Sequence, residues 1–145
     1  MMTSGRVLSV LLVDDDEGDL LMIREALDSG AREHEIHVVH DGHEALEFLQ
    51  RQGRFADAPR PDLVLLDLNM PRMDGRQVLA VVKTDEDLRR IPVVVLTTSR
   101  APADINSSYR LHANAYVTKP MSLDDLTAVV KGIDDFFGGI ADLPR

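Results

Sequence analysis

The chain contains no cysteine and no tryptophan, and its only aromatic residues are two tyrosines and four phenylalanines. Without cysteine it can form no disulfide framework, thiolate metal site or cysteine nucleophile. Long hydrophobic runs are also missing, because the apolar segment after Arg6 is interrupted by Ser9 and ends at Asp14. That segment is too short to span a membrane and lacks a signal-peptide cleavage pattern. We therefore expect a cytoplasmic protein that does not associate with a membrane.

Negative charge dominates the composition, with 25 acidic and 16 basic residues and a formal net charge of -9. This balance disfavours binding to nucleic acids or anionic membranes and favours a partner with a more basic surface. The 145 residues are enough for one domain with a hydrophobic core of its own. We expect a single domain over residues 1–145, with the core at about 7–137 and short flexible ends.

Five apolar segments have the character of β-strands, and a helical pattern follows each of them. The helical segment 100–111 is the weakest, because its apolar stripe is thin and it contains Asn106, Ser107 and Ser108. The predicted strands are Val7–Val13, Glu35–His40, Asp62–Leu66, Ile91–Ser99 and Ala115–Thr118. The predicted helices lie near 19–27, 42–49, 75–83, 100–111 and 123–137, and Gly138-Gly139 should end the last of them.

Polar residues that can cap helices precede four of the helical segments. The predicted caps are Asp16, Asp41 with Glu44, Asp74 with Gln77, and Ser122 with Asp125. Regular alternation of strand and helix predicts an α/β fold with a doubly wound, five-stranded parallel sheet. The second strand is the most polar and is placed at an edge, which gives the strand order 2-1-3-4-5 by analogy with flavodoxin-like folds.

Chemically active residues end four of these strands. Parallel strands direct their carboxyl ends to one edge of the sheet, where such folds bind ligands. The residues placed there are Asp14, Asp15, Asp67, Thr97 and Lys119. Clustered carboxylates repel each other, and a hard divalent cation such as Mg²⁺ relieves that repulsion. Asp67 could then act as a nucleophile that forms an acyl phosphate, while Mg²⁺ and Lys119 neutralise the transferred group.

Taken together, the motifs resemble those of the response-regulator receiver domains of two-component systems. The resemblance extends from about Val7 to Phe137 and rests on motifs that occur in the family's order and spacing. These motifs are the acidic pair Asp14-Asp15, the segment from Asp67 to Gly75, Thr97 after an apolar strand, and the segment from Tyr116 to Pro120.

The resemblance implies a role for each motif residue. Asp67 would accept a phosphoryl group from the phosphohistidine of a sensor histidine kinase. Mg²⁺ would be bound by the side chains of Asp15 and Asp67, by the main-chain carbonyl of Asn69, and by Asp14 through water. Thr97 and Tyr116 match the family's switch pair. The chain would not be an enzyme beyond Mg²⁺-dependent self-phosphorylation and slow self-dephosphorylation.

The loop 53–61, together with Arg60-Pro61-Asp62 and the segment Leu96–Ser99, resembles the single-domain receivers that serve phytochrome-type sensor kinases. The chain ends soon after the last helical segment, so we expect output through a separate downstream protein or through self-association. The expected output surface comprises the fourth helix, the fifth strand and the fifth helix. The same surface is a candidate homodimer interface.

Three alternative functions remain at this point. A degenerate receiver could act as a docking module without phosphorylation, although the intact acidic pair and Lys119 argue against it. An aspartate-nucleophile phosphatase of the haloacid-dehalogenase type would need a second acid where this chain has Asn69. A flavin-binding module would need a phosphate loop after the first strand, where the acidic run from Asp14 to Glu17 would repel phosphate.

Overall fold

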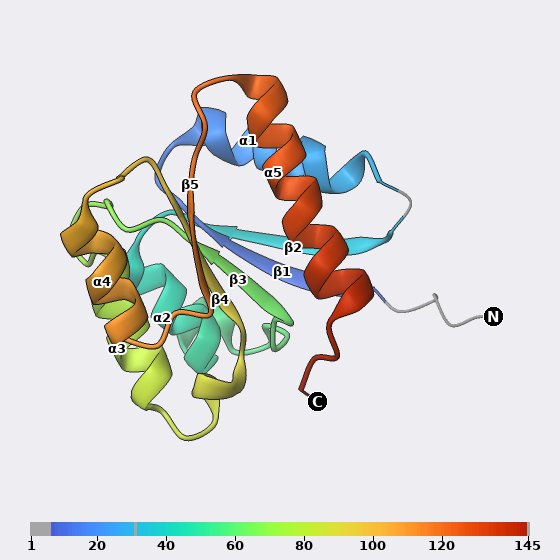
Figure 1. Cartoon of the computed structure of the whole chain (residues 1–145). Helices are drawn as coiled ribbons and strands as arrows, with labels where there is room; N and C mark the ends of the chain where they lie inside the picture. Colours follow the sequence, from blue (N-terminus) through green and yellow to red (C-terminus); the bar gives the residue numbers. More distant parts are fainter. Residues whose placement is uncertain (1–6, 31, 145) are drawn as a thin grey trace.

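The computed structural model describes residues 7–30 and 32–144 as a parallel sheet with helices on both faces (Figure 1). The ends predicted to be flexible include residues 1–6 and 145, which lie outside the described residues. The strands are β1 (Leu8–Val13), β2 (His34–Val39), β3 (Leu63–Leu66), β4 (Val93–Thr97) and β5 (Ala115–Thr118). The helices are α1 (Glu17–Asp28), α2 (Gly42–Gln50), α3 (Gly75–Thr84), α4 (Pro102–Arg110) and α5 (Leu123–Asp135), with short 3₁₀ turns at Gly53–Phe55 and Leu88–Arg90.

The sheet has the strand order β2-β1-β3-β4-β5, and all its neighbouring pairs are parallel, so the predicted topology is confirmed. Val13 at the end of β1 pairs with both Val39 of β2 and Leu66 of β3. Leu66 in turn pairs with Val95 of β4. The carboxyl ends of the strands are therefore nearly level, which brings the residues that follow them to one edge of the sheet.

Side chains from the two faces of the sheet form two separate hydrophobic clusters, as the alternation of side chains along a strand requires. On one face, Leu11 and Val13 pack with residues of α2 and α3. On the other face, Val10 and Leu12 pack with residues of α1 and α5. Figure 1 shows α1 and α5 side by side over one face, with α2 and α3 on the other. Among the described residues, no helix is both long enough and apolar enough to cross a membrane.

The helix caps largely follow the sequence prediction. The Asp16, Asp41, Asp74 and Ser122 side chains accept backbone N–H groups at the starts of α1, α2, α3 and α5. Asp74 and Gln77 form the predicted reciprocal capping box. The α2 box differs in one detail, because the Glu44 carboxylate accepts the N–H of His40 rather than that of Asp41. These caps satisfy backbone donors that the helices themselves leave unpaired.

Helix α4 forms where the sequence pattern is weakest, and it begins with a proline in its first turn. Ser108 is its only buried residue, so polar contacts rather than apolar packing attach much of this helix. The Asp104 carboxylate accepts hydrogen bonds from Ser99 Oγ and from the Arg76 guanidinium of α3. A helix attached in this way can shift at a lower cost than one buried in the core.

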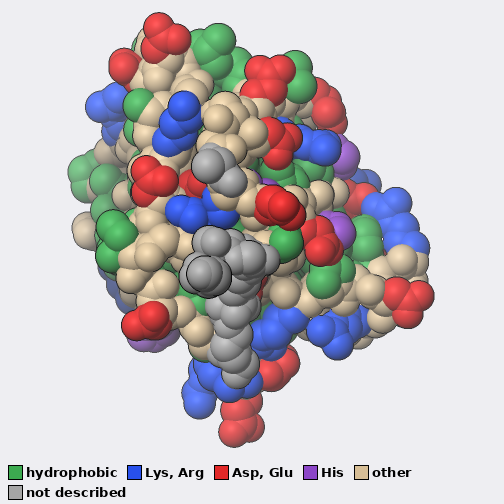
Figure 2. All heavy atoms as spheres, turned by 90° about the vertical axis from the view of Figure 1, so that its right-hand side faces the viewer, with side chains coloured by type: hydrophobic (Ala, Val, Ile, Leu, Met, Phe, Trp, Pro, Cys, Tyr) green, Lys and Arg blue, Asp and Glu red, His purple; other side chains and the backbone are tan. Residues whose placement is uncertain are grey.

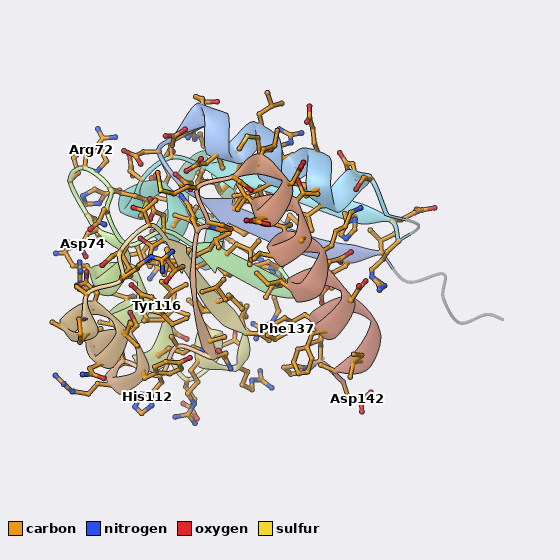
Figure 3. The ribbon with its side chains drawn as sticks, turned by 45° about the horizontal axis from the view of Figure 1, so that its top comes forward. Arg72, Asp74, His112, Tyr116, Phe137 and Asp142 are labelled. Atoms are coloured by element: carbon orange, nitrogen blue, oxygen red, sulfur yellow. The ribbon has the colours of Figure 1, made fainter. Side chains whose placement is uncertain are left out.

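The predicted end of the last helix at Gly138-Gly139 is wrong. α5 ends at Asp135 and the chain continues as a wider π-helical turn, Phe136–Ile140, that includes both glycines. A β-carbon at Gly138 would lie 2.4 Å from Arg32 Nε, so the glycine leaves room for the Arg32 side chain. Figure 3 shows Phe137 and Asp142 at this end of α5, far from Arg72 and Asp74 in the loop after β3.

Candidate functional site

Three carboxylates meet at the carboxyl edge of the sheet. Asp14 follows β1, Asp15 is next in sequence, and Asp67 follows β3. One carboxylate oxygen from each lies within 4.8 Å of the others. Asp14 and Asp67 are buried, whereas Asp15 is exposed, so the cluster has one side open to solvent. The structure therefore brings together the acids that the sequence placed at one edge.

Lys119 joins this cluster from the end of β5 and is only 6% exposed. Its Nζ lies 2.6 Å from Asp14 Oδ2 and 4.0 Å from Asp67 Oδ2. A third acid, Asp19 of α1, accepts a hydrogen bond from the same Nζ at 2.8 Å. Asp19 was not predicted, because an acid in the first turn of a helix is already explained by the helix dipole. No local signal in the sequence identifies it, since its partner Lys119 lies 100 residues away.

Burial governs the electrostatics of the cluster. It raises the pKa of Asp14 and of Asp67 above the ordinary carboxyl value. The hydrogen bond from Lys119 to Asp14, and the positive charge of Lys119 near Asp67, offset this only in part. Burial alone would lower the pKa of Lys119, but its hydrogen bonds with Asp14 and Asp19 outweigh this effect and raise it. The lysine is therefore a fixed positive charge, and the two buried acids bear a cost for being ionised.

Thr97 and Tyr116, the predicted switch pair, lie on neighbouring strands. Thr97 ends β4 and is fully buried. Its hydroxyl is close enough to favour the charged form of Asp67, but no partner lies within hydrogen-bond distance among the described residues. The half-buried Tyr116 of β5 donates its hydroxyl to the carbonyl oxygen of Ser99 at 2.8 Å (labelled in Figure 3). Thr97 thus has an unused hydrogen-bond donor facing the acidic cluster.

The loop after Asp67 folds back tightly against its own start. The Gly75 N–H donates to Leu68 O at 2.9 Å, and a β-carbon at Gly75 would lie 2.2 Å from Asp67 O. The outer part of the loop is tied to α2 by an ion pair between Arg72 and the buried Asp41. Asn69 is exposed in this loop, and its backbone N–H favours the charged form of Asp67. The loop therefore fixes the backbone beside the acidic cluster.

The donor set of the cluster consists of carboxylate oxygens, which suit a hard divalent cation such as Mg²⁺ or Mn²⁺. Burial raises the pKa of Asp14 and of Asp67, and a cation beside them would offset that cost by stabilising their ionised forms. The exposed Asp15 leaves a path for an ion with part of its water shell. The residues present therefore fit a divalent metal.

Comparison with known proteins agrees with this geometry. The sequence profile of the response regulator receiver domain matches residues 10–131, which span the sheet and most of the helices. The chain belongs to the response regulator receiver family. Receivers of this family are signalling modules of two-component systems. The fold and the acidic cluster described above are compatible with phosphorylation and metal binding in such a receiver.

Within this family, the chain is similar to response regulators of cyanobacteria. The chain is 47% identical to the response regulator Rcp1 of Synechocystis sp. over 135 residues, which cover 93% of this chain and 92% of the relative. The crystal structure of the phosphorylated cyanobacterial phytochrome response regulator RcpA superposes with a TM-score of 0.94 at 48% identity, covering 97% of this chain and all of that one. The Mn²⁺-bound form of Rcp1 gives a TM-score of 0.91 at 46% identity, with 95% and 99% of the two chains covered.

Proposed function

We propose that the chain is a phosphorelay receiver that accepts a phosphoryl group on Asp67 from the phosphohistidine of a sensor histidine kinase. The observation that carries this proposal is the position of the buried Asp67 carboxylate, which has an oxygen within 4.8 Å of oxygens of Asp14 and Asp15 and another contact, at 4.0 Å, with Lys119 Nζ. A carboxylate held in this way is a nucleophile beside a fixed positive charge.

Transfer requires an Asp67 oxygen to attack phosphorus in line with the leaving nitrogen. A new O–P bond forms, the P–N bond of the phosphohistidine breaks, and the electron pair of that bond returns to the imidazole nitrogen. Lys119 neutralises a phosphoryl oxygen on one side, and the Thr97 hydroxyl donates to another. The nearby backbone N–H of Asn69 supports the charged form of Asp67 before attack.

A bound Mg²⁺ would neutralise negative charge on the transferred group and hold it against Asp67. The proposed ligands are the carboxylates of Asp15 and Asp67 and the main-chain carbonyl of Asn69, with Asp14 reached through a water molecule. The all-oxygen donor set and the open side at Asp15 support this assignment. The same arrangement would support slow self-phosphorylation from small phosphodonors and slow self-dephosphorylation.

The phosphoryl signal would leave the site through Thr97 and Tyr116. A hydroxyl that moves toward the phosphoryl group at Thr97 alters the segment leading to Ser99, whose carbonyl oxygen accepts the Tyr116 hydroxyl. That segment continues into α4, which has a single buried residue. We propose that α4, β5 and α5 form the surface that changes on phosphorylation, for a separate downstream protein or for a homodimer.

The kinase partner is proposed to be of the phytochrome type, and the site of action the cytoplasm. The similarity to Rcp1 and to the phytochrome response regulator RcpA supports this choice of kinase, because both comparisons cover more than nine-tenths of the chain. The net charge of -9 favours a kinase surface that is more basic than the receiver.

The test is incubation with acetyl phosphate and Mg²⁺, followed by intact mass measurement. We expect one added phosphoryl group on the wild-type chain and none on Asp67→Asn. The matched control is Asp57→Asn, which removes an exposed acid from the loop 53–61 and should be phosphorylated like the wild type. A phosphoryl group that is still gained by Asp67→Asn would falsify the assignment, and no gain by the wild type would favour a docking role without phosphorylation.

A further inference from the structure

Lys119 is more strongly attached to Asp19 than to the acid on which it is proposed to act. Its Nζ donates to Asp19 Oδ2 at 2.8 Å, while Asp67 Oδ2 lies at 4.0 Å, outside hydrogen-bond distance. Asp14 Oδ2 accepts the other short hydrogen bond from Lys119, at 2.6 Å. In this unphosphorylated form the lysine is therefore held away from the acceptor by two competing carboxylates.

We propose that Asp19 is a positioning residue that restrains Lys119 and thereby slows phosphoryl transfer to Asp67. This inference rests on the proposed function and adds a residue that sets its rate. Lys119 must bring its ammonium within hydrogen-bond distance of a phosphoryl oxygen for the transferred group to be neutralised. Every contact that keeps the ammonium on Asp19 lowers the fraction of molecules in which Lys119 is available.

Asp19 is better suited than Asp14 to release the lysine. Asp14 has a side chain that is only 5% exposed, and it belongs to the acidic cluster that fits a metal. The side chain of Asp19 is 27% exposed, so water can replace the lost hydrogen bond when Lys119 moves. The restraint from Asp19 is therefore reversible at a modest cost.

The Asp19 carboxylate also adds negative charge near the point where the phosphoryl group arrives. Three acids, Asp14, Asp19 and Asp67, then lie within 4.0 Å of the single ammonium of Lys119. Replacing Asp19 with a neutral residue removes both the competing hydrogen bond and part of the repulsion. Both effects act in the same direction and accelerate transfer.

The helix can tolerate the substitution. Asp19 lies in the first turn of α1, where its backbone N–H donates to the side chain of the cap residue Asp16. That hydrogen bond involves the main chain and survives a change of side chain. Asp19→Asn keeps the shape of the side chain, and Asp19→Ser provides a second, smaller neutral variant.

The first experiment measures the rate of mass gain from acetyl phosphate at saturating Mg²⁺. We expect Asp19→Asn and Asp19→Ser to react about fivefold faster than the wild type, the upper range for a partly exposed ion pair. Glu17→Gln is the matched control, since it removes a 79% exposed acid from the same turn of α1 and leaves Lys119 untouched. Its rate should equal that of the wild type.

The second experiment shows whether Asp19 acts through Lys119. We measure the free energy of unfolding without metal for four proteins, which together form a double-mutant cycle. They are the wild type, Asp19→Asn, Lys119→Met and the double variant. We expect the two substitutions to be coupled, so that Asp19→Asn costs less stability when Lys119 is already replaced. Independent effects, or neutral variants no faster than the wild type, would overturn the role of Asp19.

Failure of this inference is distinguishable from failure of the proposed function. A wild-type chain that is phosphorylated on Asp67, together with Asp19 variants of unchanged or lower rate, contradicts only the restraint by Asp19. A wild-type chain that gains no phosphoryl group contradicts the proposed function and the restraint together.

Discussion

Two clusters of buried charged side chains lie at opposite ends of the sheet, and they differ in how well their charges match. At the carboxyl end, Asp14 and Asp67 share one ammonium, from Lys119. At the amino end, where β2 begins, the single buried acid Asp134 of α5 faces the His34 ring, with Nε2 at 2.7 Å from its Oδ1. Figure 2 looks onto this amino end, where acidic and basic side chains are interspersed.

In the amino-end cluster, two basic side chains contact the one buried acid, Asp134. Arg32 Nε lies 3.5 Å from the same Asp134 oxygen, and the side chain of His34 is fully buried. Here a buried acid is matched by neighbours of its own chain, so the cluster links β2 to α5. At the carboxyl end the acids outnumber the one ammonium of Lys119, and burial raises the pKa of Asp14 and of Asp67. We infer that matched charge fixes structure, whereas unmatched charge prepares a site for a cation and a phosphoryl group.

Breaking the matched cluster should have the largest effect on stability. We expect Asp134→Ala to lower the free energy of unfolding by about 3 kcal/mol, because the buried His34 ring loses its partner. Mg²⁺ affinity should not change, since the two clusters are at opposite ends of the sheet. Urea unfolding measures the first quantity and titration calorimetry the second. Asp135→Ala is the control, because its 76% exposed side chain makes only a 4.0 Å surface ion pair with Arg32, and it should stay within about 0.5 kcal/mol of the wild type.

Removing an acid from the carboxyl-end cluster should have the opposite result, because Mg²⁺ affinity should fall while stability stays nearly the same. We expect Asp15→Asn to weaken Mg²⁺ binding tenfold or more, equivalent to about 1.4 kcal/mol, while the stability of the metal-free protein changes little. Asp15 is exposed and therefore contributes little to folding, but its oxygen belongs to the cluster. Titration calorimetry with Glu17→Gln as control measures this difference. Equal Mg²⁺ affinity for Asp15→Asn and wild type would remove Asp15 from the metal site.

Stability and Mg²⁺ affinity should both depend on pH through the buried acids of the carboxyl-end cluster. Asp14 and Asp67 have raised pKa values in the folded chain, so the fold binds their protons more tightly than the unfolded chain does. Their contribution to the metal-free stability is therefore greatest below the ordinary carboxyl pKa of about 3.9 and falls as pH rises through the raised values. Mg²⁺ competes with these protons, so its affinity should be lower at pH 5 than at pH 7.5. Calorimetry at both values tests this, and a flat profile would contradict it.

Among these variants, Asn69→Ala should have the smallest effect on Mg²⁺ affinity. We assign only its main-chain carbonyl to the metal, so Asn69→Ala should leave Mg²⁺ affinity within about twofold, or 0.4 kcal/mol. The exposed side chain gives no reason for a larger change. A loss comparable to that of Asp15→Asn in the same titration would instead assign the amide side chain of Asn69 to the site.

Much of the fold and of the acidic edge could be predicted from local sequence patterns. The five strands, their order and the caps at Asp16 and Asp74 depend on hydrophobic periodicity and on polar residues at fixed offsets, which are local signals. The residues at strand ends follow from the topology, because parallel strands direct Asp14, Asp67 and Lys119 to the same edge. Predicting that these residues lie close together required no knowledge of side-chain conformations.

The contacts that were not predicted join distant parts of the chain. Asp19 and Lys119 are separated by 100 residues, and so are His34 and Asp134. Each acid lies on a helix, where a carboxylate is ordinary, and its partner is set by how α1 and α5 pack against the sheet. The π-helical turn after α5 likewise depends on Arg32, which packs against Gly138. No local pattern in the sequence encodes these pairings.

The fold bears unmatched negative charge at its carboxyl edge until a cation arrives. This can be measured by comparing the unfolding free energies of wild type and Asp67→Asn, first with a chelator and then with saturating Mg²⁺. We predict that Asp67→Asn is the more stable protein without metal, and that wild type gains more from Mg²⁺, about 2.7 kcal/mol at one hundred times its dissociation constant, and becomes the more stable. A metal-free wild type more stable than Asp67→Asn, or equal gains for both proteins, would show that Asp67 adds no unmatched charge at this edge.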